Sequence, residues 1–147
     1  MYLNKLKEKL SQHNVYLKPA SNDDVQLFEQ RMRFKLPLAY KEFLLLMGKG
    51  ADYFLKGSDC FINDDFEEMR TQATYILKNS GHSEKFLNNA FVFWMHQGYQ
   101  MAFFYLSESE NPKIHYFSES EKETNGIFSH LDNEQKMFRS SVYETFF

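Results

Sequence analysis

The segment FKLPLAYKEFLLLMGKG, residues 34–50, constrains the fold more than any other part of the chain. Within it, residues 38–47 are apolar except for Lys41 and Glu42. Proline is favoured in the first turn of a helix, because the N–H that it lacks would find no intrahelical acceptor there. The sequence therefore predicts a helix that starts at Pro37 and ends at a left-handed Gly48. Because a helix that is apolar nearly all round is buried on most sides, we expect it at the centre of the core.

Two amphipathic helices are predicted before this segment. Leucines at positions 3, 6 and 10 recur at helical spacing with charged residues between them, which predicts a helix over residues 2–13. Ser21, followed three residues later by Asp24, has the pattern of a capping box. It predicts a second helix that ends near Arg33.

A fourth helix is predicted after residue 62, with Asn63 as its N-cap and acidic residues in its first turn, where negative charge meets the positive end of the helix dipole. Gly81 is expected to end it. The residues of its apolar stripe are Phe66, Met69, Ala73, Ile76 and Leu77.

The second half of the chain predicts a sheet. Residues 90–106, AFVFWMHQGYQMAFFYL, have strand composition on both sides of a turn at Gly98, which is typical of a β-hairpin. Residues 113–117 predict a third strand, and residues 140–147, SSVYETFF, a short helix. We therefore expect an α+β fold, with N-terminal helices packed on a mainly antiparallel sheet in a single domain, residues 1–147.

Composition and charge narrow the class of protein. No apolar run is long enough to span a membrane, the lysines of the first ten residues are spread among leucines rather than preceding an apolar block, and the one cysteine cannot form an internal disulfide. We therefore expect a cytoplasmic protein. Residues 1–50 carry a net charge of +4 and residues 51–147 a net charge of −7. Acidic clusters disfavour nucleic acid as a partner and favour a basic protein.

The acidic side chains are the candidate partner-binding residues. The first group, at the start of the fourth predicted helix, is Asp64, Asp65, Glu67 and Glu68; the second, around the third predicted strand, is Glu108, Glu110, Glu119, Glu121 and Glu123. A simpler interpretation also fits: helix capping for the first group and a solvated loop for the second. Tyr99 at the hairpin turn, with Trp94 nearby, could add exposed aromatic area, although ordinary sheet packing is the favoured interpretation.

Three weaker patterns are compatible with an enzyme. His96 and His115 on neighbouring strands, with a carboxylate, could bind a metal. Cys60 could act as a nucleophile if a histidine approached it, although a lone cysteine is more often a buried filler. The adjacent Asp64 and Asp65 could suggest metal-dependent hydrolysis. On a helix, however, their side chains would diverge by about 100°, which suits capping better than shared binding of a metal ion. The chain also contains no phosphate-binding loop or nucleophile elbow, and we predict a protein with no catalytic role, metal or cofactor.

The sequence resembles the SUKH superfamily, which includes the Smi/Knr cell-wall-regulator homologues of fungi. The resemblance lies in a helix glutamate, a Leu-Pro pair, an aromatic residue, a Phe-Leu pair and a glycine-containing stop, and it extends loosely from about residue 22 to the end. Arg33 departs from the pattern, because a glycine is usual there, and MGKG replaces the more common Asn-Gly-Gly. The residues that match are Glu29, Leu36, Pro37, Tyr40, Phe43, Leu44, Gly48 and Gly50.

The resemblance implies a function without catalysis. Bacterial members are similar to immunity proteins, which are encoded beside polymorphic toxins, many of them nucleases, and bind the toxin's effector domain. Fungal relatives act as regulators through protein contacts. We therefore expect a cognate toxin as the partner, and keep as the alternative an intracellular scaffold or regulatory module of the same fold.

The central motif generates a stability prediction. If Leu36, Tyr40, Phe43, Leu44 and Met47 are core residues, Phe43→Ala should lower the free energy of unfolding by about 3–5 kcal/mol, the range for truncating a buried phenylalanine. Thermal melting of the variant and the parent measures the effect. A melting temperature within a degree or two of the parent would contradict the assignment.

Overall fold

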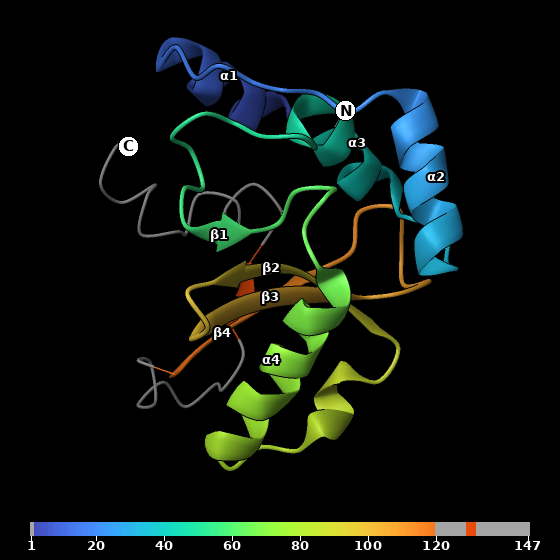
Figure 1. Ribbon diagram of the computed structural model, residues 1–147, viewed down its shortest axis with the longest axis vertical. Helices are drawn as coiled ribbons and strands as arrows, with labels where there is room; N and C mark the ends of the chain where they lie inside the picture. Colours follow the sequence, from blue (N-terminus) through green and yellow to red (C-terminus); the bar gives the residue numbers. More distant parts are fainter. Residues whose placement is uncertain (1, 120–128, 132–147) are drawn as a thin grey trace.

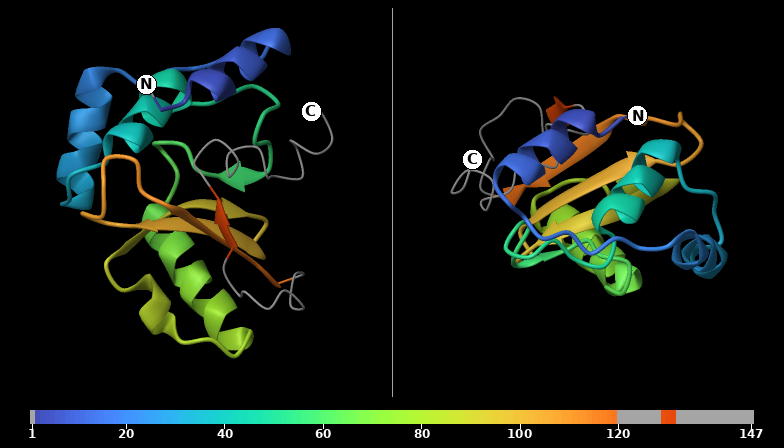
Figure 2. Two further views of the ribbon diagram at one scale, coloured as in Figure 1. Left: turned by 180° about the vertical axis from the view of Figure 1, so that it is seen from behind. Right: turned by 90° about the horizontal axis from the view of Figure 1, so that it is seen from above.

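Three helices cover one face of an antiparallel sheet and a fourth covers the other (Figures 1 and 2). The computed structural model describes residues 2–119 and 129–131. This arrangement confirms the predicted α+β class. The predicted helix over residues 140–147 lies outside the described residues.

The helices fall where the apolar periods predict them. They are α1 (Asn4–Gln12), α2 (Asn22–Met32), α3 (Leu38–Met47), α4 (Phe66–Asn79) and a short 3-10 helix, η1 (Glu84–Leu87). The capping box of α2 is present, since the Ser21 hydroxyl accepts from the Asp24 N–H and the Asp24 carboxylate accepts from the Ser21 N–H. At the end of α4, the left-handed Gly81 permits the N–H of His82 to reach back to the Leu77 carbonyl, which is the Schellman arrangement.

The sheet has the strand order β1-β2-β3-β4-β5. Its strands are β1 (Ser58–Asp59), β2 (Ala90–His96), β3 (Gln100–Tyr105), β4 (Ile114–Ser118) and β5 (Ser129–Leu131). All pairs are antiparallel, and the β2–β3 hairpin turns at Gly98 as predicted. Every residue of β2 and β4 is buried, because helices cover both faces of the sheet.

A β-bulge in β2 changes which side chains share a face. Val92 pairs with Phe103 and Trp94 pairs with Ala102, so Phe93 has no partner on β3. Cross-strand partners lie on the same face of a sheet, and side chains alternate along a strand. The extra residue therefore places Trp94 on the same face as Phe91, whose partner is Phe104. That face is turned toward α3.

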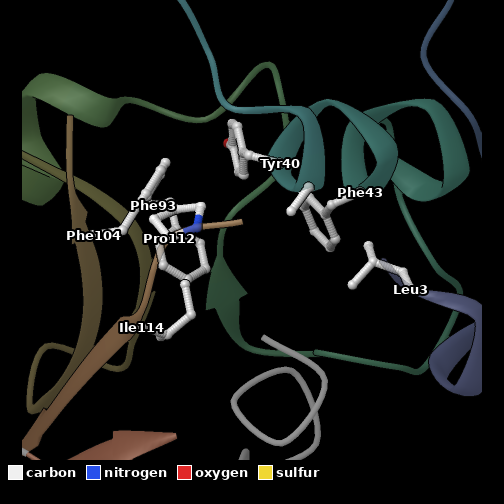
Figure 3. A pocket seen from close by; sticks show the side chains of 8 residues that line it. Leu3, Tyr40, Phe43, Phe93, Phe104, Pro112 and Ile114 are labelled. Carbon is white, nitrogen blue, oxygen red and sulfur yellow. The ribbon is translucent and has the colours of Figure 1, made fainter. Parts of the chain in front are cut away.

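Helix α3 packs against this face through aromatic rings. The Tyr40 ring lies 5.4 Å from that of Phe91, 5.9 Å from Phe93 and 5.6 Å from Phe104. Leu3, the N-cap residue of α1, lines an apolar hollow together with Tyr40, Phe93 and Phe104 (Figure 3). The hollow holds about 20 Å³, room for about one water molecule. The hollow is thus a packing defect of the core and too small for a ligand.

Gly48 differs from its prediction. It ends α3 with φ −60°, in the right-handed region, so the prediction of a left-handed stop is wrong. The need for glycine is steric: a Cβ at this position would lie 2.5 Å from the Leu44 carbonyl oxygen and 3.0 Å from the Ala20 Cβ. The same carbonyl accepts hydrogen bonds from the N–H groups of Gly48 and Ala20, which brings the chain before α2 against the end of α3.

Carboxylates from other elements cap α3 and α1. Helix α3 begins at Leu38, one residue later than predicted, and Pro37 is its N-cap residue. Proline has no side-chain group that could accept the free N–H groups of the helix. The Glu110 carboxylate accepts the Leu38 N–H at 2.9 Å instead. The Glu42 carboxylate accepts the N–H groups of Tyr2 and Leu3 just before α1, at 2.8 and 3.2 Å. These bonds satisfy helix-terminal donors that would otherwise lack partners.

Arg33 at the end of α2 generates the second prediction. Its φ of 63° is left-handed, the conformation that costs a residue with a Cβ about 1–2 kcal/mol and glycine little. Arg33→Gly should therefore raise the free energy of unfolding by about 1 kcal/mol, which corresponds to roughly 2–4 °C in a chain of this size.

Arg33→Ala is the matched control, because it removes the side chain and keeps the Cβ. Thermal melting should show a gain for the glycine variant alone. Equal gains in both variants would assign the effect to loss of the arginine side chain and contradict the backbone explanation.

Candidate partner-binding surface

The acidic residues before and within the first turn of α4 have different roles. Asp65, and not the predicted Asn63, is the N-cap, and its Oδ1 accepts the Glu68 N–H at 3.0 Å. Asp64 lies before the helix, where its Oδ2 accepts the N–H groups of Cys60 and Phe61, both at 2.9 Å. Both aspartates therefore stabilise the local backbone, in agreement with the simpler interpretation.

Glu67 and Glu68 remain available for a partner. Both are exposed, and no cation of the described residues lies within ion-pair distance of either carboxylate. Nearby, partial burial and the charge of Asp64 raise the pKa of Asp59 above its ordinary value. The start of α4 thus presents a cluster of acidic groups that the fold does not neutralise.

Tyr75 extends this cluster along the helix, and the sequence analysis missed it. Seven residues after Glu68, or about two turns, it lies on the same side of α4. Its side chain is 66% exposed. The signal was in the sequence, because position 75 falls outside the apolar stripe of Phe66, Met69, Ala73, Ile76 and Leu77, all of which are buried as predicted. We call the outward residues Asp65, Glu67, Glu68, Thr71 and Tyr75 the α4 face.

The loop acids do not form one site. Glu110 is bound to the start of α3 and is therefore part of the fold, whereas Glu108 is exposed. Glu119 is half-buried, and its N–H donates to the Tyr99 carbonyl at 3.1 Å. Glu121 and Glu123 lie outside the described residues.

The hairpin aromatics contribute little exposed area. Trp94 is only 6% exposed, which agrees with ordinary sheet packing, because helices cover both faces of β2. The β2 bulge places its side chain on the face turned toward α3. Tyr99 is half-buried, with its ring edge-on to that of His96 at 6.0 Å.

The residues considered for an enzyme are held apart. His96 lies on β2 and His115 on β4, with β3 between them. Their partners on β3, Gln100 and Phe103, point to opposite faces of the sheet, so the two histidines do as well. The expectation that the two histidines lie on neighbouring strands is therefore wrong. Burial lowers the pKa of His96, and its Nδ1 lies 2.9 Å from the Ser58 hydroxyl. Within residues 2–119 and 129–131, no group of His, Cys, Asp and Glu could hold a metal ion.

The motif residues form the junction of α2, α3 and the core. Glu29 Oε2 accepts the Leu36 N–H at 2.7 Å, and Oε1 lies 3.4 Å from the Lys41 ammonium. Leu36, Tyr40, Phe43 and Leu44 are buried, as predicted. Gly50 pairs with Lys18, ahead of α2, through an isolated β-bridge.

Comparison with family models gives a match over residues 19–133, more than half of the chain, to the SMI1 / KNR4 family (SUKH-1). The chain belongs to this family. A search of curated proteins finds no significant match. The SUKH-1 match contains α2, α3, α4 and the sheet, whereas α1 lies before it. None of the helices in the described parts of the chain combines the length and apolar character needed to cross a bilayer.

Cys60 generates the third prediction. The thiol is 1% exposed, and burial, followed by the charges of Asp64 and Asp59, raises its pKa well above the ordinary value. Each unit of pKa lowers the reactive thiolate fraction about tenfold. At pH 8, the folded protein should therefore react with Ellman's reagent at least about tenfold more slowly than the protein in guanidinium chloride. Equal rates would restore Cys60 as a candidate nucleophile.

Proposed function

We propose that this SUKH-1 protein is an immunity protein that binds and neutralises the effector domain of a cognate toxin in the cytoplasm. Family membership supports a role in protein binding. The α4 face supports a basic partner, because it combines unneutralised carboxylates with an exposed tyrosine on one rigid helix. No catalysis by the chain is required.

Charge complementarity would speed the encounter with the toxin. Nuclease active sites are basic because they hold phosphates, and acidic surfaces raise the association rate with such sites. Among the described residues from 51 onward, ten are acidic and five are basic, a net charge of −5. Glu67 and Glu68 therefore belong to the acidic part of the chain.

Tyr75 would supply the apolar part of the contact. Tyrosine is enriched among the few interface residues that carry most of the binding free energy. Its position two turns from Glu68 gives a partner one aromatic anchor and one charged end on the same helix side.

The fold holds the α4 face in place before binding. The Arg70 guanidinium donates to the carbonyls of Ala90 and Leu87, at 2.9 and 2.8 Å, which ties α4 to the start of β2 and to η1. The buried stripe packs the opposite side of the helix onto the sheet. A preformed surface avoids the cost of ordering side chains and backbone on binding.

The fourth prediction tests this face with the product of a neighbouring toxin gene. Glu67→Lys/Glu68→Lys should slow association with that protein at least about tenfold at low salt, and the difference should shrink at 1 M salt, where the Debye length is about 3 Å. Tyr75→Ala should mainly raise the dissociation rate. Surface plasmon resonance at two salt concentrations measures both rates.

Glu8→Lys/Asp23→Lys is the matched control for this experiment. It changes the net charge equally, and Asp23 lies in the first turn of α2 as Glu67 does in α4, so one of the two losses of helix-dipole stabilisation is matched. The control should bind like the parent. Normal binding by the α4 variants would reject this face, and failure of the parent to bind any neighbouring product would favour the scaffold function.

A further inference from the structure

A hollow separates α2 from the chain that leads into α4, and the α4 face does not include it. One wall is a stripe of α2 that contains Leu27, Phe28 and Arg31, and the other wall contains residues 62–63. The hollow holds about 240 Å³, below the range of about 300–1,000 Å³ that is usual for small-molecule pockets. It therefore suits a side chain inserted by a protein partner better than a free ligand.

The Arg31 guanidinium is held at this hollow without a charged partner. Its carbon lies 4.9 Å from the centre of the Phe28 ring, and one of its nitrogens donates to the Ile62 carbonyl at 3.0 Å. No carboxylate of the described residues lies within ion-pair distance of it. A planar guanidinium fixed in this way presents its other N–H groups in the geometry that binds a carboxylate.

The other two charges of the hollow neutralise each other. The Lys49 ammonium lies 2.9 Å from the Asp24 carboxylate, which also accepts the Ser21 N–H at 2.8 Å. Among the residues that line the hollow, Arg31 therefore supplies the charge that remains unpaired. A single carboxylate fits this arrangement better than a nucleic acid does, because a chain of phosphates would be repelled by Asp24 and by the acidic start of α4.

Leu27 supplies apolar area beside this charge. Its side chain is 63% exposed, and it lies one turn before Arg31 on the same side of α2. Asn63, exposed on the other wall, does not cap α4, because Asp65 does. The hollow thus combines a fixed arginine, the residue type enriched where binding free energy is concentrated, with an apolar and an amide neighbour.

The hollow also continues the α4 face. The rings of Phe28 and Phe66 meet edge to face at 5.2 Å, so α2 packs against the start of α4, and the two helices lie beside one another in Figures 1 and 2. Asn63 lies two residues before Asp65, the first residue of that face. A partner that binds the α4 face can therefore reach the hollow as well.

We propose that the hollow receives an acidic side chain of the toxin's effector domain, whose carboxylate binds Arg31 and whose apolar neighbours pack on Leu27. The inference rests on the proposed function. It assigns the toxin a surface of mixed charge, basic where it meets Glu67 and Glu68 and carrying an Asp or Glu where it meets α2. Opposite charges at the two ends fix the orientation of the complex, because a reversed partner would bring like charges together.

The fifth prediction uses the product of the neighbouring toxin gene as the probe. Arg31→Gln should weaken its binding at least about tenfold, mainly through faster dissociation, because the carboxylate would lose its charged partner. Leu27→Ala should weaken binding about fivefold through lost apolar burial, and it leaves the contacts of Arg31 in place. Surface plasmon resonance measures both effects.

Changes on the toxin identify the acidic side chain. Each of its exposed Asp and Glu residues is replaced by Asn or Gln, and one of these variants should lose as much affinity as Arg31→Gln does. Combined with Arg31→Gln, that toxin variant should lose little more, because both changes remove the same interaction.

Two variants of this chain are matched controls. Lys35→Gln removes the same charge as Arg31→Gln from an exposed residue that does not line the hollow. Leu45→Ala truncates an exposed leucine in the middle of α3, as Leu27→Ala does in α2. Both controls should bind like the parent, and thermal melts confirm that each variant is folded.

The possible failures can be told apart. Binding like that of the parent by Arg31→Gln and Leu27→Ala, or equal weakening by the controls, would overturn the inference and leave the proposed function intact. Losses that add for every toxin variant would also overturn it. A short DNA duplex that binds the parent but not Arg31→Gln would assign the hollow to phosphate instead. Failure of the parent to bind the toxin would reject the proposed function and this inference together.

Discussion

The Glu29 carboxylate closes the turn between α2 and α3, and the position of the central helix depends on it. One oxygen holds the Leu36 N–H just before Pro37, and the other faces the Lys41 ammonium one turn into α3. Glu42 then ties α3 to the start of α1, and Glu110 ties it to the loop before β4. An apolar helix that begins after a proline has no side-chain cap of its own, so Glu110 satisfies its first donors, Leu38 N–H through the carboxylate and Ala39 N–H through the backbone carbonyl.

The aromatic packing of α3 explains where surfaces remain for partners. Tyr40 contacts the sheet on one face, and α4 covers the other, so neither face of β2 or β4 is left open. Outward helix sides are then the available surfaces. They differ in charge, because the α1–α3 layer is basic and the described residues after it are acidic. Residues 2–50 carry a net charge of +4, and the described residues from 51 onward carry a net charge of −5.

Local patterns predicted most of the fold. The stripe of α4, the capping box at Ser21 and the hairpin turn at Gly98 rest on interactions within a few residues, and all three agree with the structure. The errors concern interactions that cross the chain or the sheet. Gly48 is needed because a Cβ there would meet both the Leu44 carbonyl and the Ala20 side chain, and Trp94 is buried because helices cover both faces of β2.

The sequence by itself determined the helices, the hairpin, the core motif and the uneven distribution of charge, because each follows from residue type and spacing along the chain. Only the tertiary structure decided which charges remain free. Asp64, Asp65 and Glu110 resemble Glu67 and Glu68 in sequence, yet the first three bind backbone N–H groups and the last two face solvent. Asp64 and Asp65 accept from N–H groups three or four residues away, which local spacing allows. Glu110 instead meets the Leu38 N–H across 72 positions of the chain, and only folding brings that donor to it.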